Sequence, residues 1–115
     1  MNNVILVGRL TSDPTLEEID NDKKRTLIDI AVPRNFKNSE GLYEADFIRC
    51  VLWNGIALNT SKYCNKGDAI AIRGRIQTRN YEDIDGNKKY ITEVIAQSIS
   101  FVSPSKKEEK NKKIE

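Results

Sequence analysis

Residues 47–81 are the most informative part of this chain and open with the run FIRCVLW at residues 47–53. Successive side chains of a β-strand point to opposite faces, so this run predicts one aromatic and cationic face and one aliphatic face. The first face holds Phe47, Arg49, Val51 and Trp53, and the second holds Ile48, Cys50 and Leu52. The aliphatic face is already a complete core stripe. The face of Arg49 is therefore expected to lie outside.

Residues 69–81, AIAIRGRIQTRNY, predict a second strand with the same division. One side holds Arg73, Arg75, Arg79 and Tyr81, and the other holds Ile70, Ile72 and Ile76. Aromatic rings among guanidinium groups suit stacked bases and their phosphates. The two strands together predict a surface that binds nucleic acid.

Two other interpretations of these residues stay open. Buried strands also use phenylalanine and tryptophan, so Phe47 and Trp53 could be core residues. Arginines on an exposed strand face are often only solvated. The grouping of cations beside the rings favours base stacking on the rings and phosphate contact by the arginines.

The distribution of charge is more informative than its total. The chain has 115 residues, which predicts one domain with a modest core, and its 19 Lys and Arg against 17 Asp and Glu leave a net charge of +2. Residues 1–22 carry one base and five acids, whereas residues 49–81 carry six bases and one acid. A segregated basic stretch in a nearly neutral chain favours binding to a polyanion.

Cysteine usage and hydropathy predict a cytoplasmic protein. The two cysteines, Cys50 and Cys64, have no metal-ligand spacing and are expected to be buried thiols in a reducing compartment. The apolar run at residues 4–7 is too short for a signal peptide, and no window suits a membrane span.

Catalysis has little support in this sequence. The chain has no histidine, and no phosphate-loop pattern or nucleophile–base pair can be assembled. We expect no enzyme activity, no metal and no cofactor.

The predicted elements give an all-β fold. Strands are expected at 3–10, 26–32, 44–53, 69–82 and 89–102, with one helix at 54–64 that Asn54 caps. Residues 16–22 are expected to form an edge segment or loop, and residues 34–41 a hairpin loop after Pro33. Three strands, a helix and two strands predict the OB-fold, a five-stranded antiparallel Greek-key barrel, over residues 1–102. The charged residues 103–115 are expected to be a disordered tail.

Several segments resemble bacterial single-stranded DNA-binding proteins, and the resemblance covers residues 2–102. The matching segments are NVILVGRLTSDP at 3–14, RCVLW at 49–53, YCNKGD at 63–68, RGRIQTRNY at 73–81 and YITEV at 90–94. The resemblance implies a homotetrameric OB-fold protein that wraps single-stranded DNA during replication, recombination or repair. The first strand is our candidate for a subunit interface.

The resemblance also implies site residues. Members of the family stack bases on four aromatic positions, which correspond here to Phe36, Phe47, Trp53 and Tyr81. The family often has tryptophan at the first, second and fourth of these positions and phenylalanine at the third. Tyr43, Tyr63 and Tyr90 are expected to be structural.

Phosphate contacts are expected from eight cations. Three lie in motifs that match the family, namely Arg49, Lys66 and Arg79. Five are assigned by local charge and geometry, namely Arg34, Lys37, Lys62, Arg73 and Arg75.

The chain departs from the family pattern at two places. Some members have tryptophan followed by a histidine tied to tetramer contacts where this chain has Phe47-Ile48. Housekeeping members end in an acidic tip that recruits partner enzymes, whereas this sequence ends in Lys112-Lys113-Ile114-Glu115, so no partner enzyme is carried over. An OB-fold accessory of replication restart, an RNA-binding relative and a protein-interaction module remain alternatives.

Overall fold

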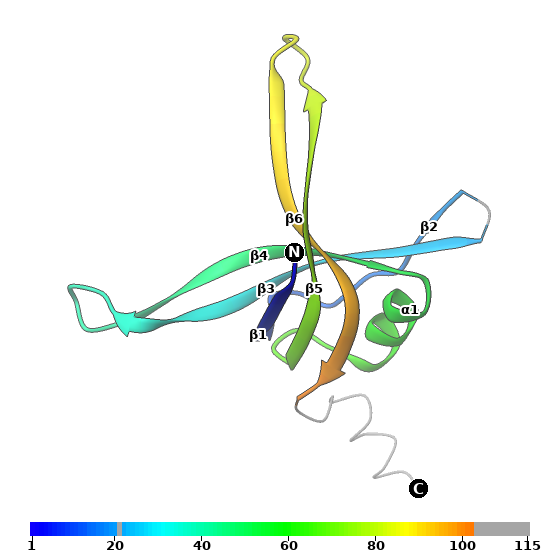
Figure 1. The fold of residues 1–115 in the computed structure, drawn as a ribbon. Coiled ribbons are helices and arrows are strands. Elements are labelled where there is room, and N and C mark those ends of the chain that lie inside the picture. Colours follow the sequence, from blue (N-terminus) through cyan, green and yellow to red (C-terminus); the bar gives the residue numbers. More distant parts are fainter. Residues whose placement is uncertain (21, 103–115) are drawn as a thin grey trace, which may run out of the picture.

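The computed structural model describes residues 1–20 and 22–102 and consists mostly of strands (Figure 1). The elements in chain order are β1 (Val4–Leu10), β2 (Glu17–Ile19), β3 (Lys23–Lys37), β4 (Tyr43–Trp53), α1 (Asn54–Tyr63), β5 (Ala69–Glu82) and β6 (Lys88–Phe101). The predicted all-β class with one helix after the FIRCVLW strand is confirmed. The expected disordered tail, residues 103–115, lies outside the described residues, and the domain boundary at residue 102 stays a prediction.

Five of the strands form one closed sheet. The order is β1-β5-β6-β4-β3, the pairing of β1 with β3 closes it, and β2 adds to the outer side of β3. Every pairing is antiparallel except β4 with β6, which is parallel at Cys50–Val94 and Val51–Ile95. A parallel pair needs a crossover connection, and α1 and β5 supply it. The expected OB-fold is consistent with this arrangement, but the expectation of a wholly antiparallel sheet was wrong at this pair.

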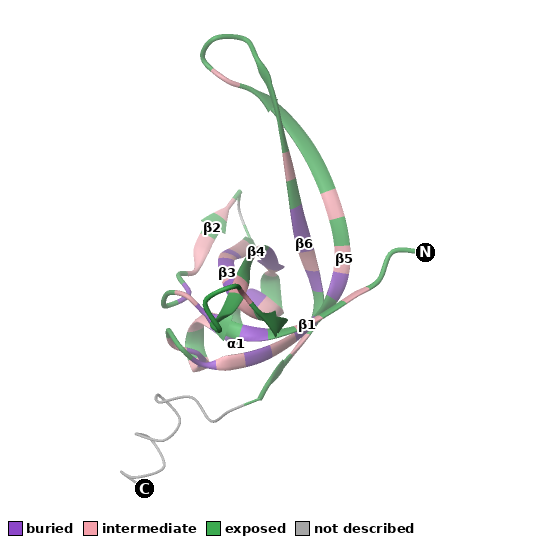
Figure 2. Cartoon of the chain, turned by 90° about the vertical axis from the view of Figure 1, so that its left-hand side faces the viewer, coloured by how far each residue is buried: buried purple, intermediate pink, exposed green. Residues whose placement is uncertain are grey.

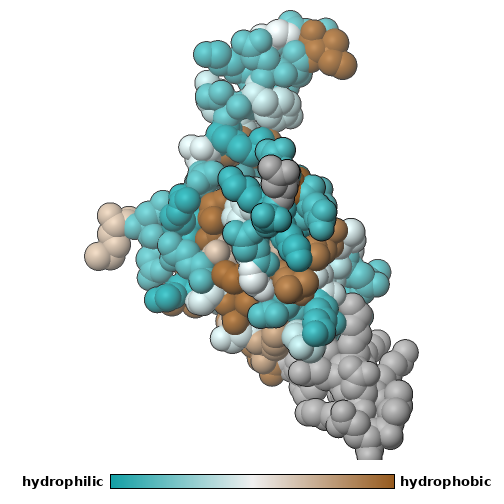
Figure 3. Space-filling model, turned by 90° about the vertical axis from the view of Figure 1, so that its right-hand side faces the viewer, coloured by the Kyte–Doolittle hydropathy of each residue, from teal (hydrophilic) through white to brown (hydrophobic). Residues whose placement is uncertain are grey.

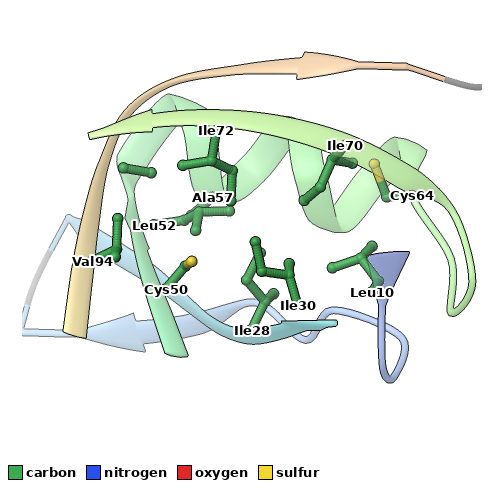
Figure 4. Packing of buried hydrophobic residues seen from close by; sticks show 11 residues of the cluster. Leu10, Ile28, Ile30, Cys50, Leu52, Ala57, Cys64, Ile70, Ile72 and Val94 are labelled. Carbon is green, nitrogen blue, oxygen red and sulfur yellow. The ribbon is translucent and has the colours of Figure 1, made fainter. Parts of the chain in front are cut away.

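The core fills the inside of the closed sheet (Figure 4). Its side chains alternate along the strands as predicted, and Ala57 of α1 adds to them. Fully or almost fully buried members include Leu10, Ile28, Ile30, Cys50, Leu52, Cys64, Ile70, Ile72 and Val94. Both cysteines are therefore core residues, and burial raises the pKa of the Cys50 thiol to about 12.

Two long hairpins project from this body, one formed by β3 and β4 and one by β5 and β6 (Figures 1 and 2). The expected inward position of Ile76 was wrong, because the side chain is exposed where the β5–β6 hairpin extends past the core. The expected loop at residues 34–41 was also wrong, since β3 continues through Pro33 to Lys37. The register of β3 and β4 shifts between Pro33 and Lys37, and such irregularities are where a strand accepts proline.

The helix starts differently from the prediction. Trp53 occupies the N-cap position, and no side chain caps the helix. Asn54 is the first helical residue, with a φ of 51° that asparagine tolerates better than most residues. Its side-chain Oδ1 accepts a hydrogen bond from the backbone N–H of Lys24 at 3.2 Å. Asn54 therefore ties the start of α1 to the start of β3 instead of capping its own helix.

Gly74 lies where β5 bends between its two neighbours. The register of β5 with β6 shifts between Arg73 and Gly74, and β1 pairs with β5 only from Ala69 to Gly74. A Cβ atom on Gly74 would overlap the backbone carbonyl oxygen of Ile95. This close approach of two strands requires glycine.

We predict that Gly74→Ala lowers the free energy of unfolding by about 1–3 kcal/mol, because the added methyl group forces the strands apart. Gly55→Ala is the matched control, since a Cβ there meets nothing described within 4 Å and alanine favours the helix. Urea unfolding followed by the emission of Trp53 measures both. Equal stability of Gly74→Ala and the unchanged protein would contradict the prediction.

Candidate nucleic-acid interface

A polar hollow of about 340 Å³ lies on the outer face of the sheet where β3, β4, β5 and β6 meet. Its volume is in the range of small-molecule sites. It is lined by Arg25, Leu27, Val51, Trp53, Gln77, Arg79, Glu93 and Ile95. Two predicted site residues, Trp53 and Arg79, are therefore brought together from strands distant in the sequence.

Trp53 and Arg25 form the β3–β4 end of the hollow. They are cross-strand partners, and the guanidinium carbon of Arg25 lies 5.9 Å from the centre of the indole ring. Arg25 also donates a hydrogen bond to Glu17 at 3.3 Å. Sequence reasoning missed Arg25, because the predicted strand began only at residue 26, whereas β3 begins at Lys23. Extending the alternation back along β3 from Leu27 would have found it.

The β4 face continues outward from the hollow as predicted. Phe47 is 71% exposed and pairs with Ala31, so it is not a core residue. Arg49 lies between Phe47 and Val51 on the same side of the strand, where its cross-strand partner is Asp29.

The β3–β4 hairpin carries two further exposed rings. Phe36 is exposed near the end of β3. Tyr43 was expected to be structural but is 62% exposed, and the Nζ atom of Lys37 lies 5.7 Å from the centre of its ring. The hairpin therefore extends an aromatic and cationic surface away from the body.

The β5–β6 hairpin carries exposed tyrosines. Tyr81 is exposed as expected, whereas Tyr90, expected to be structural, is 74% exposed. Figure 3 shows a hydrophilic hairpin with hydrophobic surface at its tip, where Ile84 is fully exposed.

The arginines of β5 do not all lie together. Arg75 pairs with Ile95, which lines the hollow. Arg73 pairs instead with Ile5 of β1 and Ser98 of β6. The strand bends around the closed sheet at Gly74, so alternation alone could not show that Arg73 lies apart.

Two cations of the predicted set lie near the helix rather than near the hollow. The Nζ atom of Lys62 lies 5.3 Å from the centre of the Tyr63 ring on α1. Tyr63 in turn lies 6.5 Å from the ring of Phe101, as its expected structural role requires. Lys66 follows α1, and its backbone N–H donates to Asp13 at 2.7 Å. No residue of α1 or of the turn after it lines the hollow.

Carboxylates accompany the arginines of the β3–β4 hairpin. Arg34 donates to Asp46 at 2.8 Å and to Glu44 at 3.0 Å. The hydrogen bond with Arg34 lowers the pKa of Asp46 below its ordinary value. Nearer the body, Arg49 donates to Asp29 at 2.7 Å, and this hydrogen bond raises the pKa of Arg49.

A further ion pair lies inside the hollow. The Nε atom of Arg79 donates to Glu93 at 3.1 Å. The Glu93 side chain is only 6% exposed, whereas that of Arg79 is 53% exposed. The carboxylate is therefore at the base of the hollow and the guanidinium at its mouth. Sequence reasoning did not anticipate acidic partners on this face.

Aromatic rings and ion-paired arginines thus lie together on the outer face of the sheet and on its hairpins. Comparison with known proteins gives the family. The model of the Single-strand binding protein family matches residues 1–102. The chain belongs to this family.

Relatives within the family come from several bacteria. The Single-stranded DNA-binding protein of Bacillus cereus is 49% identical over 104 residues, which are 90% of this chain and 61% of that protein. Single-stranded DNA-binding protein 1 of Lactococcus lactis is 48% identical over 106 residues, 92% of this chain and 71% of that protein. Single-stranded DNA-binding protein B of Bacillus subtilis is 45% identical over 107 residues, 93% of this chain and 95% of that protein. This chain thus spans 60–61% of the Bacillus anthracis and Bacillus cereus relatives.

The described residues offer neither a metal site nor a membrane-spanning helix. No cluster of three His, Cys, Asp or Glu side chains there could hold a metal ion. No helix in residues 1–20 and 22–102 is long and apolar enough to cross a membrane.

We predict that Arg79→Gln lowers the free energy of unfolding by about 1–3 kcal/mol, because the buried Glu93 carboxylate loses its partner. Arg79→Gln combined with Glu93→Gln should recover most of this loss, since no buried charge remains. Thermal unfolding of the two variants at pH 7 gives the comparison. If the single and double variants are equally unstable, the ion pair is not the cause.

Proposed function

We propose that this chain binds single-stranded DNA without sequence preference and protects it during replication, recombination or repair, without catalysing a reaction. The observation that carries the proposal is the hollow that Trp53 lines together with Arg25 and Arg79, with the guanidinium of Arg25 beside the indole ring. Family membership supports it, because the relatives above are named single-stranded DNA-binding proteins.

The proposed mechanism combines stacking with phosphate contact. Bases would stack on Phe36, Phe47, Trp53 and Tyr81, and each stacked base contributes about 1–3 kcal/mol. Every base has a π face, so stacking tolerates any sequence. The bases of duplex DNA are already stacked, so we expect duplex to bind poorly.

Eight cations would contact phosphates along this track. Four of them are exposed on the strands that carry the rings, namely Arg34, Lys37, Arg49 and Arg79, and Arg75 on β5 is partly buried. Arg73, Lys62 and Lys66 lie apart from the hollow, and their proposed contacts require DNA to wrap around the body.

We predict that oligo-dT quenches the emission of Trp53 at low salt, because a stacked base would cover the ring. Trp53 is the only tryptophan of the chain, so the signal reports this position alone. Trp53→Ala should weaken binding by about 1–3 kcal/mol, measured by anisotropy of labelled oligo-dT, with unchanged circular dichroism.

Oligo-rU and duplex DNA of equal length are the controls for this titration. Equal affinity for oligo-rU would favour the RNA-binding alternative. Unquenched emission and unchanged anisotropy with every oligonucleotide would exclude the stacking mechanism and favour a protein-interaction module.

We also propose that the chain assembles into a homo-oligomer, a tetramer, through β1. Ile5 is 68% exposed and Val7 is exposed beside it, although both are on a strand of the closed sheet. Among the described residues, β1 pairs with β3 only at Arg9 and Leu10, so its earlier residues leave one backbone edge open. An open apolar edge favours pairing with another strand.

An apolar hollow of about 390 Å³ borders the same strand. It is lined by Val7, Gly8, Arg9, Ala31, Pro33, Ala45 and Ala69. A neighbouring subunit would cover this hollow together with the edge of β1.

We predict that Ile5→Arg reduces the mass of the assembly, because the charge would have to be buried at the subunit interface. Light scattering after size exclusion should give about four times 13.1 kDa for the unchanged protein and a smaller mass for the variant. Leu58→Arg on the exposed side of α1 is the control and should leave the mass unchanged. A monomeric unchanged protein would contradict the tetramer.

The remaining expectations follow from this function. A cytoplasmic location, associated with the nucleoid, stays a prediction. No metal or cofactor is needed for stacking or phosphate contact.

A further inference from the structure

The arginines predicted to contact phosphate fall into two groups. Arg34, Arg49 and Arg79 each donate to a carboxylate of the chain at 2.7–3.1 Å. Within residues 1–20 and 22–102, Arg73 and Arg75 form no such ion pair. Phosphate can reach the second group without displacing anything but solvent and ions. At the first group, a phosphate must compete with a carboxylate already in place.

At Arg49 the competing anion is a single carboxylate, that of Asp29. Its Nε atom donates to Asp29 Oδ1 at 2.7 Å and its Nη2 atom to Asp29 Oδ2 at 3.3 Å. Asp29 thus occupies the guanidinium in a two-pronged contact. A phosphate binds arginine through the same planar fork, so both anions cannot use these donors at once.

The position of the pair makes the competition relevant to DNA. Asp29 and Arg49 are cross-strand partners on β3 and β4, two residue pairs from Phe47 and four from Trp53 along the ladder. Their side chains are 41% and 45% exposed, so a ligand on this face can reach them. The pair lies between two proposed stacking positions.

We propose that Asp29 is an internal competitor of the DNA phosphate at Arg49 and thereby lowers both the affinity for single-stranded DNA and its dependence on salt. The proposal rests on the proposed function. When DNA binds at Arg49, its phosphate replaces the Asp29 carboxylate as the partner of the guanidinium. The gain in electrostatic free energy is therefore smaller than at an arginine without a carboxylate partner. Asp29 keeps the interface nearly neutral and makes binding easier to reverse.

A different role for Asp29 would have the opposite effect. If the carboxylate held Arg49 in the orientation that DNA needs, its loss would weaken binding. The two roles therefore differ in the sign of one measurement.

Asp29→Asn is the test, because asparagine has nearly the same shape and lacks the charge. The backbone carbonyl of Asp29, which accepts hydrogen bonds from Thr11, stays in place. We expect oligo-dT to bind about two- to fivefold more tightly, the range for loss of an exposed ion pair. The slope of log affinity against log salt should steepen by about 0.7, the value for one added contact to a single strand.

Two comparisons separate local competition from overall charge. Glu18→Gln removes the same charge from β2, where Glu18 is exposed, and should change affinity less than Asp29→Asn. In a protein that also carries Arg49→Gln, Asp29→Asn should raise the affinity for oligo-dT no more than Glu18→Gln does. The reason is that the guanidinium for which Asp29 competes is absent. Thermal unfolding checks that each variant is folded.

Each result decides a different point. Weaker binding of Asp29→Asn would show that Asp29 positions Arg49 and would overturn the proposal. Equal tightening by Glu18→Gln, or tightening that persists without Arg49, would also overturn it. If the unchanged protein fails to bind oligo-dT at any salt concentration, the proposed function itself fails.

Discussion

Closure of the sheet by β1 and β3 sets which side of each strand faces the core. The pairing of β1 with β3 at Arg9–Ala31 and Leu10–Ile30 joins the two ends of the strand order. A closed sheet has one interior, and side chains alternate along each strand. Every strand must therefore direct one set of side chains inward and present the other to solvent. The aromatic and cationic side of β4 is outside for this reason.

The two projecting hairpins follow from the same constraint. The core needs only the parts of β3 to β6 that surround it, and the remaining lengths extend past it with both faces in water. Phe36 and Tyr43 lie on one extension, and Tyr81 and Tyr90 lie on the other. Rings that contribute nothing to the core remain available for a ligand. The hairpins thus enlarge the surface proposed to bind single-stranded DNA.

Charge compensation is the second property of this surface. Asp29, Asp46 and Glu93 each partner an arginine that sequence reasoning had assigned to phosphate. The folded chain thereby avoids repulsion among neighbouring guanidinium groups before any ligand arrives. Glu93 is the most buried of the three, and its pairing contributes to stability as well as to the surface.

Five of the strands, the outward face of β4 and the core stripe of Cys50 and Leu52 could be predicted from the sequence, because alternation is a local property of extended backbone. Motif resemblance added the family. Three relations are visible only in the folded chain: Arg25 lies beside Trp53, Arg73 lies away from the hollow, and Asp29 accepts a hydrogen bond from Arg49. These relations depend on strand register, on bends such as that at Gly74, and on pairings between residues far apart in the chain. Register is set by the packing of the whole sheet, and no single strand carries it.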